Sequence, residues 1–328
     1  MKPQRYKFID VAKGILIICV FTGHLNWLAV GKGISSSYIG TIDEIARVWS
    51  SFFMAAFFFI TGYCSNFNKE YRTFLLNDLR SLIVPSLTLA VFPIGIIWAF
   101  TGQWDLSSIR PYHLVRFISC HWFLPALFWA KQIHFFCRKI GIVSCTIVYL
   151  ILGCIGVFLS HRVMDYWWMQ HSFIFVIFIF FGEQFKVRRI SLGNIWYLIF
   201  YIILFVLLRI ILKNELVVTS GVYINWWEYP LFILIALAGT LGLMYLSKLI
   251  NTNKVLERLG KSSLVIYCLH FSLIQVFFIT FRSSLNALNS HTILLALLAL
   301  YIFAFTGALI IERIFDTKYL RWMIGKHD

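Results

Sequence analysis

Residues 8–30 read FIDVAKGILIICVFTGHLNWLAV, an apolar run interrupted by three ionisable side chains. Its length suits a membrane, because about 20 apolar residues in an α-helix span the hydrocarbon core of a bilayer. Nine further runs follow, and they are continuous, whereas the strands of a membrane barrel alternate polar and apolar residues. The sequence therefore predicts an all-α polytopic membrane protein with about ten transmembrane helices. The expected spans are Phe8–Val30, Ile45–Tyr63, Leu82–Thr101, Ile118–Cys137, Ile140–Ser160, Ser172–Phe185, Asn194–Leu212, Tyr223–Ser247, Ser262–Phe281 and Thr292–Ile311.

The composition favours the same fold class. Hydrophobic residues make up 60% of the 328 residues and charged residues only 13%, whereas about a quarter of the residues in soluble proteins are charged. A soluble globule of this size has too little interior to bury so much apolar surface. This excludes a disordered chain, a disulfide-rich secreted fold and a soluble nucleic-acid binder. We find no linker and no internal repeat, so residues 1–328 are expected to form a single membrane domain without a separate soluble one.

The charge distribution predicts the orientation. Lys and Arg number 29 against 14 Asp and Glu, a net charge of +15. An even number of spans places both termini on one side, and that side then holds 21 of the 29 cationic residues. Because positive residues accumulate on the cytoplasmic side, we expect both termini in the cytoplasm. Topology therefore explains most of the surplus charge, and nucleic acid is not expected as a partner.

The first span carries Asp10, Lys13 and His24 on one stripe. At 100° per residue, His24 returns to within about 20° of Lys13, roughly 16 Å further along the helix. Ionisable residues inside a membrane are costly and mark functional sites by default. An imidazole at this depth is suited to general acid–base chemistry. The alternative is structural: an interfacial Asp10–Lys13 ion pair and a packed, hydrogen-bonded histidine.

Other polar residues of the spans give weaker signals. Tyr267 and His270 share one helix face, and alone they favour core packing or a helix–helix hydrogen bond. Trp122, at the outer start of the fourth span, is typical of an interface anchor. No metal-binding spacing occurs, so no metal is expected. The seven Cys residues lie mostly within spans and favour apolar packing.

Five stretches, in order along the chain, resemble motifs of the acyltransferase-3 family of bacterial integral-membrane O-acyltransferases. Three departures from the family pattern stand out: Lys13 replaces a common Arg, Ala55 replaces a usual Pro, and Asn77 to Arg80 is less basic than is typical. The matching stretches are residues 5–24 (an aspartate, a basic residue, ten apolar residues and a histidine), 54–63 (MAAFFFITGY), 72–85 (a basic loop ending in LIVP), 121–127 (HWFLPAL) and 260–270 (GKSSLVIYCLH).

The resemblance implies transfer of an acyl group, usually acetyl from cytoplasmic acetyl-coenzyme A, to a sugar hydroxyl of a cell-envelope glycan or its lipid-linked precursor. It also implies the bacterial cytoplasmic membrane as location, with lipids and the glycan as partners. We then expect His24 as general base with Asp10 ordering the mouth of the first helix. The remaining expected site residues are Lys13, Arg72 and Arg80 for the phosphates of coenzyme A, and Trp122, Tyr267 and His270 for the acceptor or acyl pocket.

Two alternatives stay open. The acetyl group is transferred either directly or through an acyl-histidine at His24, and the group that stabilises the oxyanion is not identified. A different class, a transporter of a small anion or a lipid-linked sugar, also fits ten spans, a buried His and a basic face. The ionisable residues gather on one helix, and we find no inverted repeat, which favours the enzyme.

Overall fold

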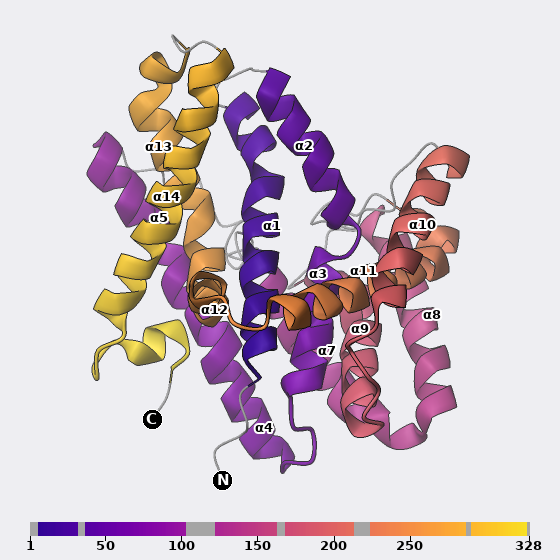
Figure 1. Ribbon diagram of the computed structural model, residues 1–328. Helices are drawn as coiled ribbons and strands as arrows, with labels where there is room; N and C mark the ends of the chain where they lie inside the picture. Colours follow the sequence, from indigo (N-terminus) through magenta and orange to yellow (C-terminus); the bar gives the residue numbers. More distant parts are fainter. Residues whose placement is uncertain are drawn as a thin grey trace.

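The computed structural model describes residues 6–31, 37–102, 122–162, 168–212, 224–286 and 290–326. Every regular element within these ranges is helical, which confirms the predicted all-α class (Figure 1). The α-helices are α1 (Lys7–Gly31), α2 (Ser37–Ser50), α3 (Phe53–Cys64), α4 (Tyr71–Asp78), α5 (Val84–Thr101), α7 (Phe123–Cys137), α8 (Ile142–Ser160), α9 (Met169–Val187), α10 (Ile195–Leu212), α11 (Tyr229–Ile250), α12 (Lys254–Lys261), α13 (Ser263–Asn286) and α14 (Ser290–Phe315). Short elements join them: the π-helix η1 (Leu79–Ile83) and the 3₁₀-helices η4 (Arg138–Ile140), η6 (Trp226–Glu228) and η7 (Arg321–Ile324).

Six helical segments within the described residues are long and apolar enough to cross a membrane. The predicted count of ten spans and the cytoplasmic location of the termini therefore remain predictions. Residues 118–121 of the fourth predicted span lie outside the described residues, and α7 is only 15 residues long. The six segments are Lys7–Leu25, Gly40–Cys64, Ile142–Ser160, Trp226–Ile250, Ser263–Phe281 and Leu295–Phe315.

The predicted second span is broken in the structure. The helix stops at Ser50 and restarts at Phe53, so α2 and α3 replace one continuous helix. A carbonyl freed at such a break is costly in an apolar setting unless another group reaches it. Here the hydroxyl of Tyr201 in α10 donates to the carbonyl oxygen of Val48, and the same hydroxyl lies 3.4 Å from Ser51 Oγ.

Two helix crossings have no room for side chains. In the first, α1 meets α12: a Cβ atom on Gly14 would overlap the carbonyl of Leu256, and one on Gly260 would overlap the carbonyl of Asp10. In the second, α3 meets α9 in the same reciprocal way, with Gly62 against Ile179 and Gly182 against Phe59. Small residues allow close backbone approach between helices in membranes. Glycine at these positions is therefore required by the packing.

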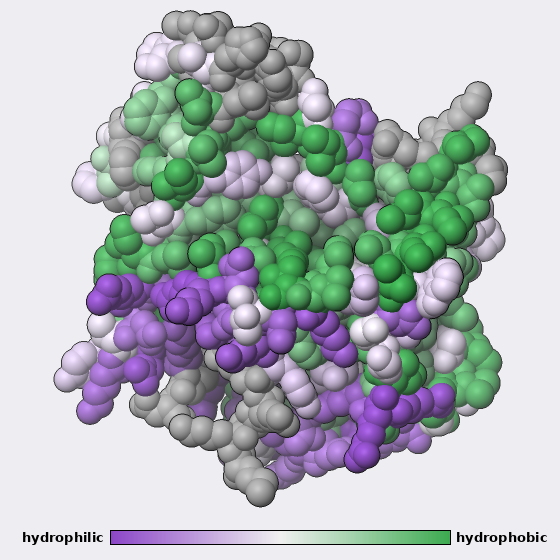
Figure 2. Space-filling model, in the orientation of Figure 1, coloured by the Kyte–Doolittle hydropathy of each residue, from purple (hydrophilic) through white to green (hydrophobic). Residues whose placement is uncertain are grey.

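Helix α1 runs through the middle of the molecule, with α5, α13 and α14 on one side and α3, α9 and α11 towards the other (Figure 1). Its start and the C-terminal η7 lie at the same end (Figure 1). Hydrophilic residues gather across this end, and an apolar belt lies above them (Figure 2). Exposed side chains of α12, including Lys254, Arg258 and Lys261, belong to this end. We call this end the polar end.

Candidate functional site

The structure brings His24 and His270 together, although they are far apart in the sequence. Helices α1 and α13 pack side by side, and the two imidazole centroids are 5.2 Å apart with 35° between the ring planes. Phe271 closes one side, with its ring centroid 5.3 Å from that of His24. Two histidines at this distance form a site in which one ring can exchange protons with a bound group while the other contacts it.

The surroundings of His270 determine which nitrogen carries its proton. His270 is buried (4% exposed), and its Nδ1 lies 2.5 Å from the carbonyl oxygen of Tyr267, one helical turn earlier. Because a carbonyl oxygen only accepts, Nδ1–H is the donor. In a neutral ring Nε2 then carries the lone pair. The predicted Tyr267–His270 pair is thus a local contact through the backbone of Tyr267.

Tyr267 continues the site towards α7. Its hydroxyl accepts a hydrogen bond of 3.3 Å from the backbone N–H of Phe123, and the two rings lie 5.4 Å apart. Trp122, the residue before Phe123, is half-buried and lies 4.8 Å from His171 at the start of α9. Four of the predicted residues, His24, His270, Tyr267 and Trp122, therefore lie along one continuous row of rings. His171, which the sequence reasoning missed, extends that row.

Asp10 and Lys13 lie on α1 where α12 crosses it. Asp10 is buried and Lys13 half-buried, and Gly260 packs directly on the backbone of Asp10. The predicted stripe therefore starts beneath α12, a helix that the sequence reasoning did not identify. The side chain of Asn253 caps this helix by accepting from the backbone N–H groups of Val255 and Leu256, both at 3.0 Å.

A buried carboxylate ties α12 to α14. Glu312 is 2% exposed and accepts from Arg258 at 3.1 Å, from Lys326 at 3.0 Å and from the hydroxyl of Ser262. Three donors compensate the cost of burying its charge. The signal for this residue was available, because Glu312 directly follows the last predicted span. Through it, α12 is held across the polar end of α1.

Arg72 and Arg80 are exposed on α4 and η1. Within the described residues, no hydrogen bond or ion pair joins either of them to Lys13. The π-helix that carries Arg80 has a local cause. Pro85 has no N–H and its ring clashes with the carbonyl four residues earlier. The helix widens before it, so that the N–H of Val84 bonds to the carbonyl of Leu79.

A second polar cluster, centred on His134, escaped the sequence reasoning. His134 is fully buried in α7, with Nδ1 2.8 Å from the hydroxyl of Tyr149 and Nε2 2.8 Å from Oε2 of Glu183. Arg138 approaches the other oxygen of Glu183 at 3.6 Å. His134 and Glu183 both lie within predicted spans, so the criterion that selected His24 also applied to them.

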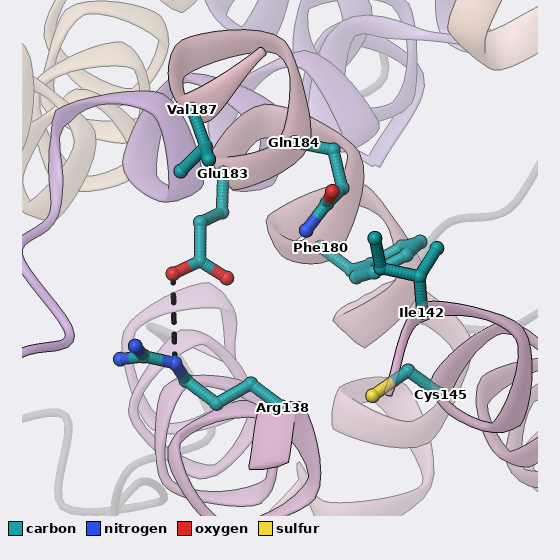
Figure 3. A pocket seen from close by; sticks show the side chains of 7 residues that line it. All are labelled: Arg138, Ile142, Cys145, Phe180, Glu183, Gln184 and Val187. Atoms are coloured by element: carbon teal, nitrogen blue, oxygen red, sulfur yellow. Dashed lines mark ion pairs between the residues drawn. The ribbon is translucent and has the colours of Figure 1, made fainter. Parts of the chain in front are cut away.

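This cluster adjoins a pocket of about 190 Å³ between η4, α8 and α9. Glu183 and Arg138 face each other across it, with Cys145 and Gln184 beside them (Figure 3). None of its lining residues is among the predicted site residues. The rings around His24 and this pocket are therefore separate features of the molecule.

The described residues contain no group of three or more His, Cys, Asp or Glu arranged to hold a metal ion.

Comparison with known proteins gives one match. A family model described as an acyltransferase domain matches residues 6–313. No curated protein and no solved structure matches the chain. The match includes α1 with His24, the α3 and α4 segments, α7 and α13 with His270, so it contains every residue of the candidate site. Because it covers most of the 328 residues, the chain belongs to the acyltransferase-3 family and is a membrane acyltransferase.

Proposed function

We propose that this protein is a membrane O-acyltransferase that moves an acetyl group from cytoplasmic acetyl-coenzyme A to a sugar hydroxyl of a cell-envelope polysaccharide or its lipid-linked precursor. One observation carries the proposal. The ring centroids of His24 and His270, which come from two helices, lie 5.2 Å apart in an interior row of rings. His24 also lies on the same face of α1 as Lys13, which is at the polar end. The proposed location is the cytoplasmic membrane of a bacterium.

In the proposed reaction, neutral His24 accepts the proton of the acceptor hydroxyl while the oxygen attacks the thioester carbonyl. The carbon–sulfur bond then breaks, and the imidazolium returns its proton to the leaving thiolate of coenzyme A. The products are an O-acetyl ester and free coenzyme A, and no proton is gained or lost overall. Such a positioned base contributes about 10²–10⁴-fold to a rate.

The donor is proposed to enter from the polar end. Lys13 lies at the mouth of α1, and Arg72 and Arg80 add two exposed cations at the same end; cationic side chains bind phosphates through charge-assisted hydrogen bonds. The roughly 16 Å rise between Lys13 and His24 is comparable to the length of a pantetheine arm. Asp10 lies about 21 Å from His24 along the helix axis, which is too far for it to orient the imidazole ring. Its proposed role is to order the mouth of α1.

The acceptor hydroxyl is proposed to approach along the row of rings. Tyr267 and Trp122 present aromatic surface of the kind that packs against sugar rings. His270, with Nδ1 held by the carbonyl of Tyr267, directs Nε2 as a polar contact for the acceptor or the acyl group.

The test is acetyl transfer by membranes supplied with labelled acetyl-coenzyme A and extracted envelope glycan. His24→Ala should lower the rate by about 10²–10⁴-fold. The matched control is His161→Ala, an exposed histidine at the end of α8, which should keep the wild-type rate. Full transfer by His24→Ala at equal protein abundance contradicts the mechanism.

The same assay separates two routes. If acetyl label accumulates on the protein when the acceptor is omitted, and His24→Ala abolishes this labelling, transfer passes through an acyl-histidine. If no label is trapped and free coenzyme A appears only with acceptor, transfer is direct. Import of label without any coenzyme A release would contradict acyl transfer.

A further inference from the structure

Asp78 is an acidic residue in the segment that the proposed function assigns to phosphate binding. It ends α4, directly before the π-helix that carries Arg80. A carboxylate facing solvent here would repel the phosphates of coenzyme A. Asp78 is instead 3% exposed, so its side chain points into the protein and away from the exposed cations of the segment.

The partners of Asp78 come from α7. Lys131 Nζ forms an ion pair with Oδ1, and Gln132 Nε2 donates to Oδ2 at 2.9 Å. Lys131 is itself 9% exposed and also lies over the ring of Phe74, 5.1 Å from its centroid. Both carboxylate oxygens and the ammonium group are thus engaged inside the protein. A buried pair of this kind contributes little net stability, but it selects one arrangement of the elements that it joins.

The π-helix is held at both of its ends. Asp78 holds the start of the π-helix, and the C-terminal turn packs against its other end. There a Cβ atom on Gly325 would lie 2.9 Å from Pro85 Cγ and 3.0 Å from the carbonyl oxygen of Ser81. The hydroxyl of Thr88 also donates to the carbonyl of Met323 at 2.6 Å. Short π-helical segments are rare and occur frequently at functional sites.

We propose that Asp78 is a positioning residue that, through Lys131 and Gln132, fixes the π-helix so that the exposed guanidinium of Arg80 is held in place for a phosphate of coenzyme A. This rests on the proposed function. Asp78 does not touch the donor; it acts through the backbone between itself and Arg80. Without the carboxylate the start of the π-helix is no longer held. Binding of coenzyme A then has to order Arg80 as well, and this cost weakens the affinity.

The pH dependence of donor binding distinguishes the positioning role of Asp78 from a general effect on stability. Burial raises the pKa of Asp78 above its ordinary range; the charge of Lys131, the hydrogen bonds from Lys131 and Gln132 and the charge of Lys69 oppose this shift but do not cancel it. As pH falls, Asp78 therefore takes up a proton before an ordinary aspartate does, and the ion pair with Lys131 is lost. Donor binding by the wild type should weaken over this range, and Asp78→Asn should not show that change.

The experiment uses the full chain in nanodiscs and measures equilibrium binding of tritiated coenzyme A, which needs no acceptor. Asp78→Asn and Arg80→Gln should each raise Kd about tenfold, the size of one lost charge-assisted hydrogen bond. Because Asp78 acts through Arg80, the double variant should bind about as weakly as Arg80→Gln alone. Lys131→Arg keeps the positive charge opposite Asp78 and should bind coenzyme A within about threefold of the wild-type Kd.

The matched control is Glu183→Gln, which removes a partly buried carboxylate that pairs with His134 and has no hydrogen bond or ion pair to η1 among the described residues. It should lower thermal stability and leave Kd unchanged. Unchanged Kd in Asp78→Asn, or fully additive effects of Asp78→Asn and Arg80→Gln, overturns the positioning role. If Asp78→Asn does not fold, Lys131→Met tests the same pair. A wild-type protein that binds no coenzyme A and transfers no acetyl group overturns the proposed function itself, and the positioning role with it.

Discussion

His24 and His134 are both interior histidines, and their surroundings differ. His134 has a hydrogen-bonding partner on each ring nitrogen, the hydroxyl of Tyr149 and the carboxylate of Glu183. His24 is surrounded by the rings of His270 and Phe271, and within the described residues no hydrogen bond reaches it. Both ring nitrogens of His134 thus have a partner in the fold, whereas no described residue hydrogen-bonds either nitrogen of His24.

The difference shows that the depth of a histidine in the membrane does not by itself tell a structural role from a chemical one. Burial alone selects both residues, because an ionisable group inside a span is costly wherever it lies. The hydrogen-bond inventory separates them: a histidine whose two nitrogens are both satisfied supports the structure, and one with capacity left suits chemistry. His24→Ala, described above, is the first and largest test of this comparison, since it should lower the rate by about 10²–10⁴-fold at an unchanged thermal stability.

His134→Ala should do the reverse. It leaves the hydroxyl of Tyr149 and one oxygen of Glu183 without their present partner, which costs about 2–4 kcal/mol in the free energy of unfolding. Reversible unfolding in detergent measures this loss. Activity per folded molecule should equal that of the wild type. A folded His134→Ala protein with normal stability and no activity would remove the distinction between the two histidines.

Tyr149→Phe sharpens the comparison with a smaller change. It deletes one hydrogen bond to His134 Nδ1 and keeps the ring, so the expected loss is about 0.5–1.5 kcal/mol. The same unfolding assay applies. A loss as large as that of His134→Ala would mean that Tyr149, and not the pair with Glu183, holds the cluster together.

The smallest effect is expected for an ion pair outside the spans. The hydrogen bond from Lys326 holds the pKa of Asp316 below its ordinary value of 3.8. The stability that this pair provides is present above that value and is lost as pH falls through the lowered pKa. Both side chains are 39% exposed, so salt screens the pair. Thermal unfolding of wild type and Asp316→Asn across pH should differ slightly near neutrality and converge in acid; a constant difference would contradict this.

The sequence was sufficient for features that depend on local pattern. The predicted first span, Phe8–Val30, matches α1 at Lys7–Gly31 within one residue at each end, because the apolar run and its charged start determine a membrane helix. The stripe of Asp10, Lys13 and His24 follows from the same periodicity. Pairing between distant helices does not: nothing in the spacing of His24 and His270 indicates that their rings meet.

The features that were missed depend on distant partners. The break between α2 and α3 is stabilised by Tyr201, which lies far along the chain, so the continuous apolar run from Ile45 onwards predicted one helix. The eight residues of α12 look like a charged loop until Gly260 is seen against the backbone of Asp10. His134 and Glu183 lie within predicted spans, as His24 does; what distinguishes His134 is its partners, which lie on α8 and α9.

The glycine crossings have a consequence for how such an enzyme can change its specificity. Where α1 meets α12 and α3 meets α9, backbone touches backbone, and a contact without side chains cannot be shortened by substitution. Substitutions at these glycines can therefore only push the helices apart and disrupt the packing; they cannot bring the helices closer. A variant that accepts a longer acyl chain or a bulkier sugar has to obtain the space elsewhere. Replacing Phe123, Tyr267 or Phe271 by a smaller residue would create space beside His24 and His270 while the helices keep their spacing.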